Sequence, residues 1–164
     1  MRNLLQPNQI AKDIFAIDFT AIKSRGISAL ILDIDDTLIP RKSADVPIRV
    51  FEWIANRKEE GFKICLTSNS RHPARVAYIG KALNLPYLFM SLKPLPFAFW
   101  KSLELLQSSP RQTAMIGDQL FMDTLGANLL GIYSIYVIPM TPETFLPRIL
   151  MRQTEKWLLS KIPH

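Results

Sequence analysis

Five short apolar runs recur along this chain of 164 residues, and a stretch of helical character follows each of them. The runs cover residues 29–33, 62–67, 87–90, 113–116 and 133–138. Apolar runs without polar alternation are typical of strands buried on both faces of a parallel sheet. Strands that alternate with helices in this way form βαβ units. The pattern therefore predicts one α/β domain over residues 1–164, with a five-stranded parallel sheet and helices on both faces.

Helices are expected between the strands and near both ends of the chain. Their expected ranges are 8–24 in two pieces, 47–61, 73–83, 97–107, 122–130 and about 144–160. Asp18 is expected to cap the second N-terminal piece, and Gly26 is expected to end it. Pro47 fits the first turn of the next helix, which Gly61 ends.

The overall charge is basic, with a formal net charge of +6 and a pI near 9.6. This balance favours anionic partners: nucleic acid, a membrane surface or a phosphorylated substrate. No pattern of interleaved aromatic and basic residues supports nucleic acid. Because Cys65 is the single cysteine, an internal disulfide is excluded, and with two histidines a structural zinc site is not expected. Cys65 lies in an apolar run and is expected to be buried in the core.

The sequence does not predict insertion into a membrane. No continuous apolar stretch precedes Lys12, so no signal peptide is expected. The most apolar segment, residues 125–140, falls short of the roughly 20 residues that a spanning helix needs. The protein is therefore expected in the cytoplasm, with peripheral contact at the inner face of the membrane left open.

Three carboxylates follow the first predicted strand, at Asp33, Asp35 and Asp36. Two like charges about 4 Å apart repel by roughly 4 kcal/mol at an effective dielectric constant of about 20. A cation or a shared proton usually relieves that repulsion. Asp33 and Asp35 project to the same side of an extended backbone because they are two residues apart. The alternative interpretation is that these are turn and cap residues, since aspartate is common there.

Polar residues also follow the other predicted strands. They are Ser68 and Asn69 after the second strand, Lys93 after the third, and Gly117, Asp118 and Asp123 after the fourth. Since ligands bind beyond the carboxyl ends of parallel strands, these side chains are expected to share one site. Taken singly, each has an ordinary explanation. Turns favour hydroxyl and amide residues, a lone lysine is usually solvated, and an acid in the first turn of a helix complements the helix dipole.

The ordered set D-x-D-x-T, S-N, K-P and G-D-x-x-x-x-D resembles the four motifs of the haloacid dehalogenase (HAD) superfamily of phosphatases, over about residues 29–138. The resemblance implies a HAD-like Rossmannoid fold and a Mg²⁺-dependent hydrolysis of phosphate monoesters through an aspartyl-phosphate. It makes Asp33 the nucleophile and Asp35 the acid–base partner, because family members with a second aspartate at this place hydrolyse phosphate esters.

The same resemblance implies further roles. Mg²⁺ would be bound by Asp33, the backbone carbonyl of Asp35, and Asp118. Asp123 would bind it through water or would instead orient Lys93. The phosphoryl group would be held by Ser68, Asn69 and Lys93, and the loops would be supported by Thr37 and Gly117. Asp36 is interpreted as a turn residue, and no catalytic role is expected for Cys65, His72 or His164.

The substrate is expected to be large, because the sequence leaves no room for the cap domain that many HAD enzymes insert. Residues 38–68 are filled by one predicted loop, one helix and one strand, and residues 68–93 by one helix and one short strand. An open site of this kind suits a protein, a nucleic acid end or a lipid headgroup.

The C-terminal segment from Phe145 onward is basic and amphipathic, with a net charge of +3. Its cations are Arg148, Arg152, Lys156 and Lys161, and its apolar residues are spaced to form a broad face. Such a helix fits an anionic lipid surface, where each cation contributes about 1 kcal/mol. The alternative is a helix that packs on its own domain and leaves its basic face in solvent.

A narrower resemblance addresses the substrate. The capless layout and the segments GISALILDIDDTLI, SNS and IGDQLFMDTLGAN resemble a small bacterial family of HAD subfamily IIIA. That family is related to the mitochondrial and plastid phosphatidylglycerophosphate phosphatases. The resemblance implies removal of the terminal phosphate of phosphatidylglycerophosphate to give phosphatidylglycerol, with an anionic phospholipid as partner. The sequence departs from the family at Asp36, where an asparagine is expected.

Two other interpretations stay open at this point. The first is a HAD phosphatase that acts on a soluble metabolite, a nucleotide or a phosphoprotein. The second is a basic module without catalytic activity that binds a membrane or nucleic acid, which is disfavoured because every residue that the chemistry needs is present.

Overall fold

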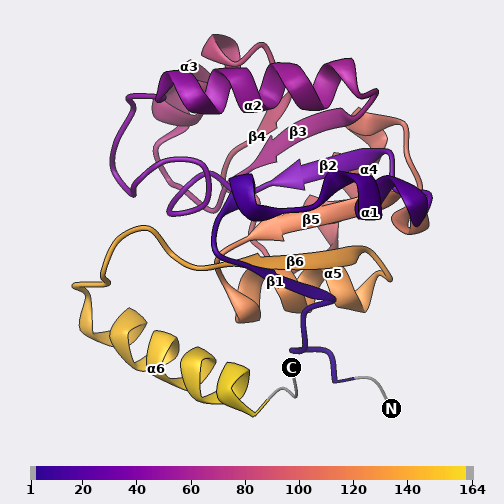
Figure 1. Ribbon diagram of the computed structural model, residues 1–164. Coiled ribbons are helices and arrows are strands. Elements are labelled where there is room, and N and C mark those ends of the chain that lie inside the picture. The colour runs from indigo at the N-terminus through magenta and orange to yellow at the C-terminus, as the bar shows by residue number, and fades with distance from the viewer. Residues whose placement is uncertain (1–2, 162–164) are drawn as a thin grey trace.

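The structure, a computed structural model, describes residues 3–161. Its centre is a six-stranded sheet with the strand order β1-β6-β5-β2-β3-β4, in which all neighbours are parallel (Figure 1). The strands are β1 (Gln9–Ala11), β2 (Ala29–Leu32), β3 (Lys63–Thr67), β4 (Tyr87–Leu88), β5 (Thr113–Gly117) and β6 (Tyr133–Val137). The predicted α/β fold with a parallel sheet is confirmed, with six strands in place of five.

The additional strand is β1, which lies at the edge of the sheet beside β6. Helix was predicted here, and that prediction is wrong for β1, because helical structure begins only at η1 (Ile14–Ala16) and α1 (Phe19–Ser24). Three residues are too few to show a periodic pattern. The strand depends instead on a distant partner: Asn8 donates its backbone N–H to the carbonyl of Ser134, and its side-chain oxygen accepts from the N–H of Ser134, both at 2.9 Å.

Helices cover both faces of the sheet. One face carries α1, α2 (Ile48–Glu59) and α3 (Pro73–Ala82), and the other carries α4 (Pro96–Leu106) and α5 (Leu125–Leu129). The remaining helical elements are η2 (Pro110–Gln112), η3 (Leu120–Thr124) and α6 (Leu146–Ser160). Asp18 caps α1, as predicted, by accepting hydrogen bonds from the backbone N–H groups of Thr20 and Ala21.

Side chains that alternate along β2 divide the core into two layers. Leu30 and Leu32 pack with the α1–α3 face, while Ala29 and Ile31 pack with the α4 and α5 face. All four side chains are fully buried, which explains the unbroken apolar run that predicted this strand. Cys65 lies in the second layer as a buried free cysteine, as predicted, and burial raises the pKa of its thiol to about 12.

The order of the strands reverses beside β2. From β2 the chain proceeds to β3 and β4 on one side, and it then returns to β5 and β6 on the other. Leu32 at the end of β2 lies in register with Leu66 of β3 and Ile116 of β5. The residues that follow these three positions therefore meet at one edge, where open α/β sheets form their ligand crevice.

The intervals that would hold a cap domain contain only elements of the sheet domain. Residues 38–68 form a loop, α2 and β3, and residues 68–93 form α3, β4 and their connections. The crevice at the carboxyl ends of the strands is thus not covered by an inserted domain in these intervals.

Helix α6 lies outside the two helical layers. Figure 1 shows it on the side of the carboxyl ends of the strands, joined to β6 by an extended connection. The end of the predicted C-terminal segment, which includes His164, lies outside the described residues. Within residues 3–161, no helix has both the length and the apolar character to cross a membrane.

Candidate active site

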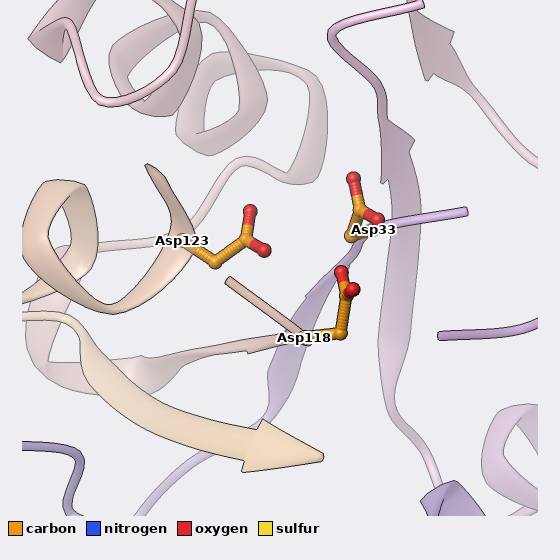
Figure 2. A group of neighbouring side chains, drawn as sticks. All are labelled: Asp33, Asp118 and Asp123. Carbon is orange, nitrogen blue, oxygen red and sulfur yellow. The ribbon is translucent and has the colours of Figure 1, made fainter. Parts of the chain in front are cut away.

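Three buried carboxylates meet at the crevice. Asp33 follows β2, Asp118 follows β5 and Asp123 lies in η3, and their exposed fractions are 4%, 0% and 2%. One carboxylate oxygen of each residue lies within 4.8 Å of one from the others. Figure 2 shows the three side chains close together, with those of Asp118 and Asp123 turned toward Asp33. These three aspartates therefore lie close together, as we expected for residues that follow the carboxyl ends of parallel strands.

This triad has the chemistry of a site for a hard divalent cation. Mg²⁺ prefers oxygen ligands, and the three nearest ligand groups are carboxylates. Asp33 Oδ2 is buried and accepts no hydrogen bond within residues 3–161. Since a buried polar atom is costly without a partner, this oxygen suits a cation or an electrophile. Asp35 is not part of the side-chain cluster, and its predicted contribution through the backbone carbonyl stays a prediction.

Gly117 provides the space in which Asp123 approaches the triad. A Cβ atom at position 117 would lie 2.7 Å from Asp123 Cβ and still closer to its carboxylate, a clash that real side chains do not tolerate. Asp123 Oδ2 also accepts the backbone N–H of Gln119 at 3.2 Å. The glycine that was predicted as a supporting residue thus lies directly beneath a candidate metal ligand.

Lys93 places its ammonium between two of the three carboxylates. Its Nζ lies 2.6 Å from Asp33 Oδ1 and 2.7 Å from Asp123 Oδ1, and it donates to the carbonyl of Thr67 at 3.0 Å. Burial lowers the pKa of Lys93, but the two carboxylates outweigh it and hold that pKa above its ordinary value. A lone solvated lysine is therefore excluded as the explanation. The ion pair with Asp123 places that residue where it could orient Lys93, a role that stays a prediction.

Burial is the largest influence on the pKa of Asp33 and on that of Asp118. It is opposed by Lys93 and reinforced by Asp123, and the net result raises the pKa of Asp33 to about 7. Burial and the nearby Asp33 carboxylate likewise raise the pKa of Asp118, although Arg152 opposes them. Because a bound cation favours the ionised forms, metal would lower the pKa of both groups again.

Ser68 and Asn69 follow β3, and the structure gives them different partners. Ser68 is buried, and its Oγ accepts the backbone N–H of Ser70 at 3.0 Å, so its hydroxyl hydrogen can still be donated to a ligand. The amide of Asn69 is engaged with the loop after β4: it donates to the Lys93 carbonyl at 3.0 Å and accepts from the Lys93 N–H at 2.9 Å and from Ser91 Oγ at 2.8 Å. Asn69 thus holds Lys93 in place, and its contact with phosphate stays a prediction.

Asp35 lies at the rim of the site, half-buried beside an arginine that the sequence reasoning did not single out. Arg75 of α3 places Nη2 2.8 Å from Asp35 Oδ1, and its Nε donates to the carbonyl of Ser43 at 2.7 Å. A partly exposed carboxylate at the edge of the crevice can exchange protons with solvent and with a substrate. This position suits the acid–base role that was predicted for Asp35.

Thr37 and Asp36 occupy the turn after β2. Thr37 is buried, and its hydroxyl lies 3.5 Å from Asp118 Oδ1, at the limit of a hydrogen bond. Asp36 has a φ of 61°, in the left-handed region that aspartate tolerates. Its carboxylate accepts from Arg41 Nε at 3.0 Å and from Thr141 Oγ1 at 2.5 Å. The Asp36 carboxylate therefore joins the loop of Arg41 to that of Thr141 at the rim of the site.

Arg152 is the main residue of the site that sequence reasoning did not find. It belongs to α6, and its guanidinium contacts both the Oδ2 atom and the backbone carbonyl of Asp118. It also donates to Glu155 Oε2 at 3.0 Å, and Glu155 Oε1 accepts the backbone N–H of Phe121 at 3.3 Å. The expectation of a basic face in solvent is wrong for Arg152, which is 9% exposed.

Sequence comparisons agree with the site. The profile of the HAD-hydrolase-like family matches residues 92–138, which include the Lys93 loop and the Asp118 and Asp123 positions. Over 163 residues the chain is 30% identical to the probable phosphatase YqeG of Bacillus subtilis (strain 168), an alignment that covers 99% of this chain and 94% of the relative.

Solved structures of low sequence identity share the fold. An uncharacterized protein from Listeria monocytogenes serotype 4b is 20% identical, with a TM-score of 0.56 over 83% of this chain and 100% of that one. The magnesium-bound HAD-hydrolase YfnB of Bacillus subtilis is 15% identical, with a TM-score of 0.57 over 72% and 90%. The cobalt-bound phosphatase YrbI of Haemophilus influenzae is 14% identical, with a TM-score of 0.57 over 84% and 90%.

Proposed function

The chain belongs to the HAD-family phosphatases that include the probable phosphatase YqeG, and from this premise we propose that it hydrolyses phosphate monoesters with Mg²⁺ through an aspartyl-phosphate on Asp33. One observation carries the proposal. Asp33 offers a buried oxygen that has no hydrogen-bond partner within residues 3–161, while its other oxygen is held by Lys93. We include residues 1–164 in a single catalytic domain, to which α6 contributes.

In the first step, an Asp33 oxygen attacks the phosphorus atom and the bond from phosphorus to the leaving oxygen breaks. Asp35 gives its proton to that leaving oxygen, so that an alcohol departs. In the second step, Asp35 takes a proton from a water molecule whose oxygen attacks the phosphorus. The bond to Asp33 breaks, inorganic phosphate leaves, and both aspartates return to their initial state.

Negative charge on the transferring group must be stabilised in both steps. Lys93 lies within contact distance of the attacking carboxylate, so its ammonium acts directly on a phosphoryl group bound there. Ser68 can add a hydroxyl hydrogen bond. Mg²⁺, held by Asp33, Asp118 and Asp123, would supply electrostatic stabilisation of the phosphoryl oxygens and orient them for attack.

Replacement of Asp33 or Asp35 by asparagine tests these roles. Asp33→Asn is expected to abolish phosphate release because the amide cannot form the phosphoenzyme. Asp35→Asn is expected to lower kcat by about 10²–10⁴-fold, the usual contribution of acid–base catalysis. Asp45→Asn, at an exposed loop position, is the matched control and should keep wild-type activity. Undiminished phosphate release by Asp33→Asn would refute the nucleophile.

We extend the proposal to the substrate, a phosphate ester on a lipid headgroup, with phosphatidylglycerophosphate as the specific candidate. The lack of an inserted cap domain in residues 38–93 supports it, as do apolar side chains beside the site. Leu92 and Leu95 flank the buried Lys93 and are 60% and 55% exposed. Acyl chains or the bilayer surface would give these side chains an apolar contact while the phosphate reaches Lys93.

The outer face of α6 supports the same substrate. Leu146, Leu150 and Trp157 are 67%, 58% and 55% exposed, and their spacing places them on one side of the helix. Exposed cations on α6, such as Lys156, lie beside this apolar side. Amphipathic helices with such a composition bind the interface of anionic membranes. In this proposal the protein works as a peripheral enzyme at the cytoplasmic face of the membrane, and nucleic acid is not a partner.

A substrate panel separates lipid from soluble substrates. The enzyme with Mg²⁺ is offered phosphatidylglycerophosphate in mixed micelles, sugar phosphates, nucleotides and a phosphopeptide. The lipid is expected to have the highest kcat/KM, and faster turnover of a soluble ester would overturn the lipid assignment while leaving the phosphatase in place. A double variant, Leu150→Ser with Trp157→Ser, should lose activity on vesicles containing the lipid, whereas Leu129→Ser on α5 should not.

A further inference from the structure

Arg152 reaches the metal-binding aspartate from outside the sheet domain's two layers. It is carried by α6, the last helix, yet its guanidinium is buried against Asp118 at the end of β5. No other basic side chain within residues 3–161 forms an ion pair with Asp118. Arg152 therefore gives Asp118 an ion pair, whereas Lys93 in the loop after β4 pairs with Asp33 and Asp123.

The guanidinium holds Asp118 at two points. Nη2 contacts the carboxylate at Oδ2, and Nη1 donates to the backbone carbonyl of the same residue. Two contacts to one residue fix the direction of its side chain more strictly than a single charge contact does, because the planar guanidinium has a rigid geometry. Oδ1 stays directed to the other side, where its neighbour is Thr37 at 3.5 Å.

Arg152 is itself fixed by a second buried group. Glu155, one turn further along α6, is fully buried and accepts from Nη1 at 3.0 Å. The other oxygen of Glu155 accepts the backbone N–H of Phe121 in η3, the element that also carries Asp123. The chain of contacts from η3 through Glu155 and Arg152 to Asp118 thus joins the elements that carry two members of the triad.

We propose that Arg152 is a positioning residue for the metal site: it holds Asp118 by Oδ2, so that Oδ1 is directed to bind Mg²⁺, and Glu155 holds Arg152. The proposal rests on the Mg²⁺-dependent function proposed above. It makes α6 part of the active site, because the helix supplies the contact that orients a metal ligand. Partners of this kind around metal ligands change metal affinity by about 10–100-fold when they are replaced.

The decisive variant is Arg152→Lys, because it keeps the positive charge and removes the two-point contact. Repulsion between this charge and Mg²⁺ is then similar in both proteins, and only the geometry of Asp118 differs. Isothermal titration of the metal-free protein with Mg²⁺ measures affinity without reference to activity. Arg152→Lys is expected to weaken Mg²⁺ binding by about 10-fold or more, and Arg152→Met should weaken it at least as far. Glu155→Gln should produce a smaller loss in the same direction.

Arg148→Met is the matched control, since Arg148 lies one turn earlier on α6 and is exposed. Its one ion pair among the described residues is with Glu143 at 3.8 Å. It should bind Mg²⁺ as the wild type does. A circular dichroism spectrum and a melting curve confirm that each variant is folded, and Arg152→Lys serves if Arg152→Met does not fold. Wild-type affinity in Arg152→Lys, or tighter binding in Arg152→Met, would overturn the positioning role. Absence of a Mg²⁺ titration in the wild type would instead overturn the proposed metal-dependent function.

Discussion

Replacement of Lys93 by methionine removes the ammonium that contacts both Asp33 and Asp123. In the wild type these contacts are 2.6 and 2.7 Å long, and all three side chains are buried. Methionine has an unbranched apolar side chain that can occupy the same space as the carbon chain of Lys93. Two buried carboxylates lose their partner, and removal of one member of a buried ion pair costs about 3–5 kcal/mol. At about 2–4 °C per kcal/mol, the metal-free variant is expected to melt roughly 6–20 °C below the wild type.

The size of this loss should depend on pH. Burial raises the pKa of Asp33 from 3.8 to about 7. At pH values between these two, the folded protein therefore holds a proton that the unfolded chain releases. This group therefore lowers the stability of the metal-free protein as pH rises from about 4 to 7. Without Lys93 the pKa of Asp33 rises further, and the decline continues above pH 7. The difference in Tm between wild type and variant should thus be larger at about pH 8 than at about pH 5.

Differential scanning calorimetry in the presence of a chelator measures both effects. The control is Lys101→Met, which removes an exposed pair with Glu104 and should change the free energy of unfolding by less than about 1 kcal/mol. If Lys93→Met has the same melting temperature as the wild type at both pH values, the buried ammonium does not hold the carboxylates together and the reasoning is refuted.

Two further predictions concern the metal. Asp33 must lose its proton to bind Mg²⁺, and its pKa is about 7. Because the pKa of Asp118 is raised as well, apparent Mg²⁺ affinity measured by calorimetry should fall at least about tenfold per pH unit below 7. A flat profile from pH about 5 to 7 contradicts this. Gly117→Ala should weaken Mg²⁺ binding by at least about tenfold because the new Cβ displaces Asp123. Gly61→Ala is the control: among the described residues its Cβ would meet no atom within 4 Å, although its φ of 91° strains an alanine. It should melt at a lower temperature than the wild type and keep wild-type Mg²⁺ affinity.

The meeting of Asp33 and Asp118 could be predicted from the sequence because both acids follow strands that are easy to find. β2 and β5 are buried on both faces, so each gives an unbroken apolar run that ends at an acid. The geometry of parallel sheets then brings Asp33 and Asp118 to the same edge. β1 was missed for the opposite reason: it has only three residues, and its place depends on a pairing with β6.

The contacts around the acids could not be predicted in this way. Arg152 and Arg75 lie on helices. The periodic pattern of a helix does not show which of its polar side chains contacts a residue at the end of a strand that is distant in the sequence. For α6 the sequence showed an amphipathic pattern with apolar residues on one side and charged residues on the other. The period of such a pattern is the same whether the apolar side or the charged side is buried. The direction of α6 depends on its connection to β6 and on the contact of Glu155 with Phe121. That information resides in the tertiary structure.

The account depends most directly on Asp33 as the group that carries the phosphoryl intermediate. Wild-type enzyme with Mg²⁺ is mixed with a chromogenic aryl phosphate, quenched rapidly in acid, digested and analysed by mass spectrometry. The account predicts one phosphoryl group on the peptide that contains Asp33, and none in Asp33→Asn. Steady turnover by the wild type with no phosphoryl group on that peptide, or with the group on another residue, would contradict it.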